Sequence, residues 1–134
     1  MSLFEDRKNS ALIVIDVQNG VVAEAHNRDT VIANINAALL KARGYGVQVI
    51  WVQHSDEEMP IGSDAWQIVP ELVPLAGEAR VEKLFRSSFM GTNLEQVLDH
   101  GDVAHLYICG AETNNCVRHT THTALEIGFD VTLI

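Results

Sequence analysis

The stretch Ala11-Leu-Ile-Val-Ile-Asp16 decides the fold class, because an apolar run without alternation ends at a single carboxylate. An uninterrupted run of this kind, rich in β-branched residues, is typical of a strand buried on both faces of a parallel sheet. Two comparable runs follow, Val47-Gln-Val-Ile-Trp-Val52 and Val103-Ala-His-Leu-Tyr-Ile-Cys109. The sequence therefore predicts a parallel sheet whose first strand ends at Asp16.

The segments between these runs predict connecting helices. Helical spacing of apolar residues extends over 31–42, after a candidate cap at Asn27, and a second helix is expected from a cap at Thr92 through Leu98. Cys116 begins a third helix. Residues 81–84 and 129–134 complete a set of five strands. Strands that alternate with helices indicate right-handed βαβ units, and so an α/β fold with helices on both faces of the sheet.

Composition and charge restrict the class of protein. The 134 residues suit one domain over 1–134, and the net charge of −9 argues against nucleic acid or an anionic membrane as a partner. The N-terminal residues lack a signal-peptide pattern, and no apolar run approaches a membrane span. The two cysteines, Cys109 and Cys116, form no CxxC pair and suit a reducing compartment. We therefore expect a cytoplasmic protein that acts on a small molecule.

The last six residues predict neighbours that this chain does not supply. Residues 129–134 indicate a parallel strand, and such a strand needs cover on both of its faces. The helix after Cys116 can cover one face only. We therefore expect a C-terminally incomplete domain, with residues beyond Ile134, in a homo-oligomer, either a dimer or a tetramer, that covers the other face.

Three reactive side chains are predicted to meet at one edge of the sheet. Asp16 ends the first strand, Lys83 lies near the end of the third, and Cys116 follows the fourth. In open α/β sheets, the ligand crevice lies beyond these carboxyl ends. A cysteine attacks as its thiolate, which a helix N-terminus and Lys83 would favour, and Asp16 could take the proton. Taken singly, each residue also fits a structural role, as a loop carboxylate, a surface lysine or a packed thiol.

Other polar and aromatic residues are weaker candidates for substrate binding. Gln18 could contact substrate or close a turn, and His54 could bind substrate or belong to a plain loop. Trp66, in the long connection over 54–80, could line a pocket or plug the core. His119 and His122 lie three residues apart on a predicted helix, which favours a solvated face over a metal site.

Four segments together resemble the isochorismatase-like cysteine hydrolases, in the amidohydrolase branch. They are residues 11–19, Lys83 with Ser87-Ser-Phe89 and Thr92-Asn-Leu94, residues 110–117, and residues 124–133. The resemblance implies a three-layer α/β/α fold. It also implies that the family continues after the fifth strand with another helix and usually a sixth strand, which agrees with an incomplete C-terminus.

The resemblance also implies the chemistry. It assigns Cys116 as nucleophile, Asp16 as general base and Lys83 as the group that stabilises charge. It implies a cis peptide between Ala111 and Glu112, with the N–H groups of Glu112 and Cys116 as the oxyanion hole. The expected reaction is hydrolysis of a small amide, ureido or carbamoyl C–N bond through an acyl-cysteine.

No cofactor and no metal are predicted. The nicotinamidase branch of the family binds a metal through an Asp-x-His pair after the second strand, whereas this chain has Gln53-His-Ser-Asp56, in the reverse order. Two other functions remain open. One is a thiol redox protein that uses Cys116 to sense peroxide, and the other is a non-catalytic binding or scaffold protein with the same fold.

Overall fold

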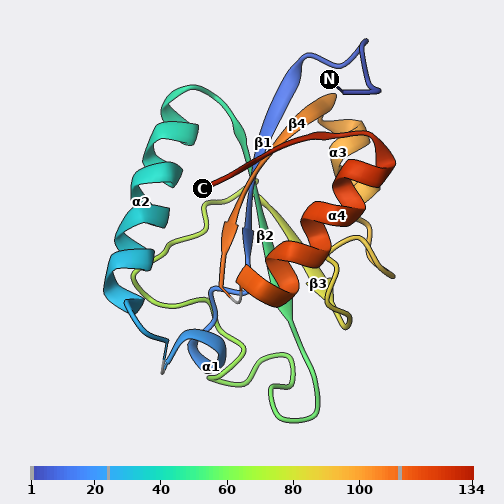
Figure 1. The fold of residues 1–134 in the computed structure, drawn as a ribbon. Coiled ribbons are helices and arrows are strands. Elements are labelled where there is room, and N and C mark those ends of the chain that lie inside the picture. Colours follow the sequence, from blue (N-terminus) through green and yellow to red (C-terminus); the bar gives the residue numbers. More distant parts are fainter. Residues whose placement is uncertain (1, 24, 112) are drawn as a thin grey trace.

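The computed structural model describes residues 2–23, 25–111 and 113–134. Along the chain, the elements are β1 (Asn9–Ile15), α1 (Asn19–Val22), α2 (Arg28–Gly44), β2 (Gln48–His54), β3 (Ala79–Lys83), α3 (Leu94–His100), β4 (Val103–Gly110), a π-helical turn (Thr113–Val117), α4 (Arg118–Ile127) and β5 (Asp130–Leu133). Figure 1 shows α2 on one side of the sheet and α3 and α4 on the other.

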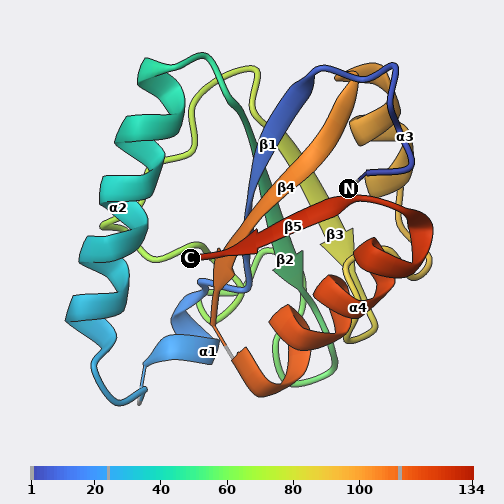
Figure 2. The same ribbon diagram turned by 45° about the horizontal axis from the view of Figure 1, so that its top comes forward.

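The sheet is parallel throughout, with the strand order β3-β2-β1-β4-β5. The connections from β3 to β4 and from β4 to β5 pass over one face, and the connection from β1 to β2 passes over the other (Figure 2). This arrangement confirms the predicted α/β fold with a parallel, Rossmann-like sheet. Because every strand runs in the same direction, all the carboxyl ends lie at one edge.

Each strand of the sheet centre contributes to two cores. On β1, Ala11, Ile13 and Ile15 pack in the core beneath α3 and α4, whereas Leu12 and Val14 pack in the core beneath α2. All five side chains are buried. A strand that is covered on both faces has no polar side to expose, which is why this run does not alternate.

Three local features differ from the sequence-based expectation. The strand β2 extends to His54, because its pairing with β3 continues until His54 lies opposite Lys83. The short helix α1 was not predicted. Cys116 lies in the π-helical turn before α4 and not in the first turn of that helix.

The strand β5 is only half covered. It pairs with β4, but Leu133 and Ile134 are exposed. Beside them, a largely apolar groove of about 820 Å³ lies between α2 and the β4 and β5 side of the sheet and is lined in part by Tyr45, Tyr107 and Ile134. Residues beyond Ile134 and an assembly of several copies both stay predictions.

None of the helices in the described part of the chain has the length and apolar character needed to cross a bilayer.

Candidate active site

Four strand ends place the candidate residues at one edge of the sheet. Asp16 follows β1, while His54 and Lys83 are the last residues of β2 and β3 and lie side by side in register. The strand β4 ends at Gly110, and the π-helical turn then carries Cys116 back over the edge. The structure thus brings together Asp16, Lys83 and Cys116, which are far apart in the sequence, and adds His54 to them.

The backbone of this edge depends on a close approach at Gly110. Its φ is 149°, and a Cβ atom there would lie 2.1 Å from the carbonyl oxygen of Ile15. The next residue, Ala111, donates its N–H to that same oxygen at 2.9 Å. Asp16 has a left-handed backbone with φ of 57°, a conformation that costs a non-glycine residue on the order of 1 kcal/mol. Strain of this kind is often found at functional positions.

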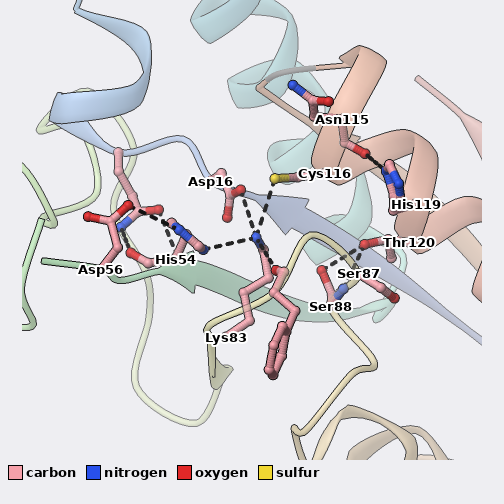
Figure 3. Close-up of polar contacts among 12 residues, drawn as sticks. Asp16, His54, Asp56, Lys83, Ser87, Ser88, Asn115, Cys116, His119 and Thr120 are labelled. Atoms are coloured by element: carbon pink, nitrogen blue, oxygen red, sulfur yellow. Dashed lines mark hydrogen bonds and ion pairs between the residues drawn. The ribbon is translucent and has the colours of Figure 1, made fainter. Parts of the chain in front are cut away.

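Lys83 is the centre of the polar contacts (Figure 3). Its Nζ atom lies 3.1 Å from Asp16 Oδ2 and donates to Cys116 Sγ at 3.3 Å. It also donates to the carbonyl oxygen of Phe85 at 3.0 Å and lies 3.4 Å from His54 Nδ1. The Lys83 side chain is fully buried, so its ammonium group depends on these partners for solvation.

The electrostatics keep the Cys116 sulfur protonated at rest. Burial and the carboxylate of Asp16 together raise the pKa of the Cys116 thiol to about 11, and Lys83 only partly opposes them. The positive charge of Lys83 is shared with Asp16, so the thiol form of Cys116 is favoured before any attack on a substrate. In the described part of the chain, Asp16 Oδ1 has no hydrogen-bond partner although it is buried. This oxygen can accept a proton when the thiol reacts.

A cleft of about 980 Å³ opens above these residues. Asp16, His54 and Cys116 line it, together with apolar side chains that are exposed at its rim. The rim side chains are Leu84, Phe85 and Met90. A cleft lined by both apolar and polar side chains suits a small organic molecule.

Gln18 and Trp66 hold the loop over residues 55–78 and do not line the cleft. The Gln18 side chain is fully buried. Its amide N–H groups donate to the carbonyl oxygens of His54 and Trp66, and its amide oxygen accepts from the His54 N–H. The Trp66 indole donates to Glu82 Oε2 at 3.2 Å. The polar atoms of both residues are already bonded within the protein, which favours the structural alternative for each, and a contact with substrate stays a prediction. His54 does line the cleft, and its role in substrate binding stays a prediction.

The predicted cis peptide between Ala111 and Glu112 lies outside the described residues, because Glu112 is not among them. The oxyanion hole formed by the N–H groups of Glu112 and Cys116 therefore stays a prediction.

Sequence reasoning missed two features of the cleft. His119 lines it from an exposed position on α4, and its Nδ1 lies 2.8 Å from the carbonyl oxygen of Asn115. The segment after Lys83 is also tied to α4, since Ser87 donates to Thr123 Oγ1 and Thr120 donates to Ser88 Oγ. The paired serines and the threonines three residues apart on the helix were the available signal.

Comparisons with known proteins agree with this geometry. Residues 10–134 match the model of the isochorismatase domain. An uncharacterized isochorismatase family protein of Bacillus subtilis (strain 168), YrdC, is 33% identical over 137 residues, which cover 97% of this chain and 72% of that protein.

Solved structures show the same similarity. The crystal structure of an isochorismatase family protein superposes with a TM-score of 0.90 at 30% identity, covering 95% of this chain and 78% of the other. The crystal structure of N-carbamoylsarcosine amidase from Thermoplasma acidophilum gives a TM-score of 0.86 at 25% identity, covering 95% and 82%. The family resemblance is thereby confirmed, and the chain belongs to the isochorismatase family of hydrolases.

Proposed function

We propose that this protein is a cysteine-dependent hydrolase of a small amide, ureido or carbamoyl C–N bond. The observation that carries the proposal is the position of Lys83 Nζ, which contacts both Asp16 Oδ2 and Cys116 Sγ beneath an open cleft. These are a nucleophile, a proton acceptor and a fixed positive charge, which acyl transfer requires. The similarity to an N-carbamoylsarcosine amidase supports a carbamoyl or related substrate.

In the proposed first step, the Cys116 thiol gives its proton to Asp16 Oδ1 while the sulfur attacks the substrate carbonyl carbon. Lys83 stays charged and stabilises both anionic partners. The N–H of Cys116, with that of Glu112, is proposed to stabilise the oxyanion. Asp16 then returns the proton to the departing nitrogen, and an acyl-cysteine remains. Water attacks this thioester while Asp16 accepts its proton. The C–S bond then breaks, and Asp16 passes the proton to the departing sulfur, which releases the acid and regenerates the thiol.

The raised pKa of Cys116 gives the redox alternative less support. A peroxide-sensing cysteine reacts as a thiolate at neutral pH, whereas burial and Asp16 favour the thiol here. A hydrolase tolerates a resting thiol, because its base removes the proton during the attack.

The proposal is tested with a panel of small N-carbamoyl compounds, ureas and primary amides. Ammonia or amine release is measured, and the protein is analysed by intact mass after rapid acid quenching. We expect release from at least one class and an added acyl mass on Cys116. Hydrolysis without any acyl adduct, and with full activity in Cys116→Ala, would contradict the covalent mechanism.

A further inference from the structure

The ammonium group of Lys83 has more acceptors than hydrogens. Among the described residues, four acceptor atoms surround Nζ: Phe85 O at 3.0 Å, Asp16 Oδ2 at 3.1 Å, Cys116 Sγ at 3.3 Å and His54 Nδ1 at 3.4 Å. A lysine ammonium carries three N–H donors. Two of these acceptors must therefore share one donor.

The strengths of the acceptors decide which two share it. The Asp16 carboxylate is charged and the Phe85 carbonyl is the closest, so each holds one N–H. The third N–H faces either the sulfur of Cys116 or the imidazole nitrogen of His54. A neutral thiol is a weak acceptor and imidazole nitrogen is a good one, whereas a charged thiolate is stronger than either.

The structure holds His54 in the orientation that this sharing needs. Its main-chain N–H donates to Gln18 Oε1 and its carbonyl accepts from Gln18 Nε2, both at 2.9 Å. The carboxylate of Asp56 lies 3.3 Å from His54 Nε2 and favours a proton on that nitrogen. Nδ1 is then unprotonated and can accept from Lys83. Figure 3 shows the imidazole ring between Asp56 and Lys83.

We propose that His54 competes with Cys116 for the third N–H of Lys83 and so keeps the nucleophile in its resting thiol form. When the Cys116 proton passes to Asp16, this N–H turns from Nδ1 to the thiolate, and Lys83 itself gains and loses no proton. His54 is thus a positioning residue that acts through Lys83. This inference rests on the proposed role of Cys116 as nucleophile.

Burial and the carboxylate of Asp16 raise the pKa of the Cys116 thiol, and Lys83 lowers it only in part. Other charged or titratable side chains also face the thiol or line the same cleft. They are Asp16, Asp56, Glu58, Arg86 and His119.

The test measures alkylation of Cys116 by iodoacetamide across a range of pH, with the Cys116→Ala protein as the blank. In His54→Leu, the third N–H has only the sulfur to face. We expect a midpoint lower by about one pH unit and alkylation roughly tenfold faster at about pH 8, the size of one strengthened charge-assisted hydrogen bond. His54→Asn places a carbonyl oxygen near the position of Nδ1, and it should restore the slow rate to within about twofold. His122→Leu, an exposed position on α4, is the matched control and should not change the rate.

An unchanged or slower rate in a folded His54→Leu protein overturns the proposal, as does fast alkylation of His54→Asn. If His54→Leu does not fold, nitrogen-15 spectra of the unaltered protein decide the question. The proposal requires a proton on Nε2 and none on Nδ1 of His54, and a protonated Nδ1 overturns it. Neither experiment uses a substrate, so failure to find hydrolysis and failure of this inference are separate results.

Discussion

Two of the clusters that pair a cation with a carboxylate differ in which of their polar atoms remain without a partner. The clamp consists of Arg43, Glu78 and Trp51, and the cleft cluster consists of Asp16, Lys83 and Cys116. In the clamp, Glu78 accepts from Arg43 Nε and Nη2, from Trp51 Nε1 and from the Leu75 N–H. Both of its oxygens are satisfied. In the cleft cluster, Asp16 Oδ1 has no partner among the described residues.

The pKa shifts follow this difference. Burial alone would raise the pKa of Glu78, but its hydrogen bonds to Arg43, Leu75 and Trp51 outweigh burial and lower it to about 2. In the cleft cluster, burial and Asp16 prevail over Lys83, and the thiol pKa rises to about 11. Groups whose hydrogen bonds are complete stabilise the fold, whereas groups left incomplete beside a cleft are available to a substrate.

The largest expected effect separates the two cysteines. Cys116→Ala should reduce turnover by at least about a thousandfold with the fold kept, because it removes the proposed nucleophile. Cys109 is instead buried in the apolar core beneath α2, and burial raises the pKa of its thiol to about 12. Cys109→Ala should therefore keep turnover and lose about 1 kcal/mol of stability. Turnover and thermal unfolding are measured on both proteins. Equal activity in the two variants would refute the assignment of Cys116 as the nucleophile.

The second effect compares the two cations. Lys83→Met should lower kcat by roughly a hundredfold or more, since it removes the charge that stabilises the thiolate. Arg43→Met should leave kcat unchanged but lower the free energy of unfolding by about 2 kcal/mol, because Glu78 loses its charged partner. Steady-state kinetics of each variant give kcat, and urea unfolding gives the free energy of unfolding. A loss of kcat in Arg43→Met would show that the clamp also acts on the site.

The third effect concerns acid. The pKa of Glu78 is lower in the folded protein than its ordinary value of 4.5, so its ionised form stabilises the fold above that pH. This contribution is lost as the pH falls from about 4.5 towards about 2, and it is on the order of 2–3 kcal/mol. Glu78→Gln should be less stable at neutral pH, and the gap to the unaltered protein should close across this window. Urea unfolding at several pH values checks it, and a constant gap would refute it.

The smallest expected effect is that of removing metal ions, which should change nothing. We expect a chelator such as EDTA to leave both turnover and the unfolding temperature unchanged, because the predicted mechanism uses no metal. The control is the same dialysis without chelator. Activity that is lost with EDTA and restored by zinc or iron would place a metal in the cleft and contradict this prediction.

The local sequence was sufficient to predict the sheet and the three central residues. A run such as Ala11–Ile15 can be recognised from its own residues, because burial on both faces removes all alternation. The carboxyl ends of parallel strands must share one edge, so Asp16, Lys83 and Cys116 were expected to meet without knowledge of any contact.

The tertiary structure alone decided how the remaining groups are used. The register of β2 against β3 places His54 beside Lys83, and a register depends on the pairing of whole strands. Gln18 and Trp66 are residue types that often bind substrates. In the folded chain, however, the Gln18 amide donates to the Trp66 carbonyl in the loop over residues 55–78, and the Trp66 indole donates to Glu82. The protonation of Cys116 likewise depends on burial and on charges from distant parts of the chain. Strand identity is thus a property of neighbouring residues, whereas the partners and the pKa of a side chain are set by segments that meet only in the folded protein.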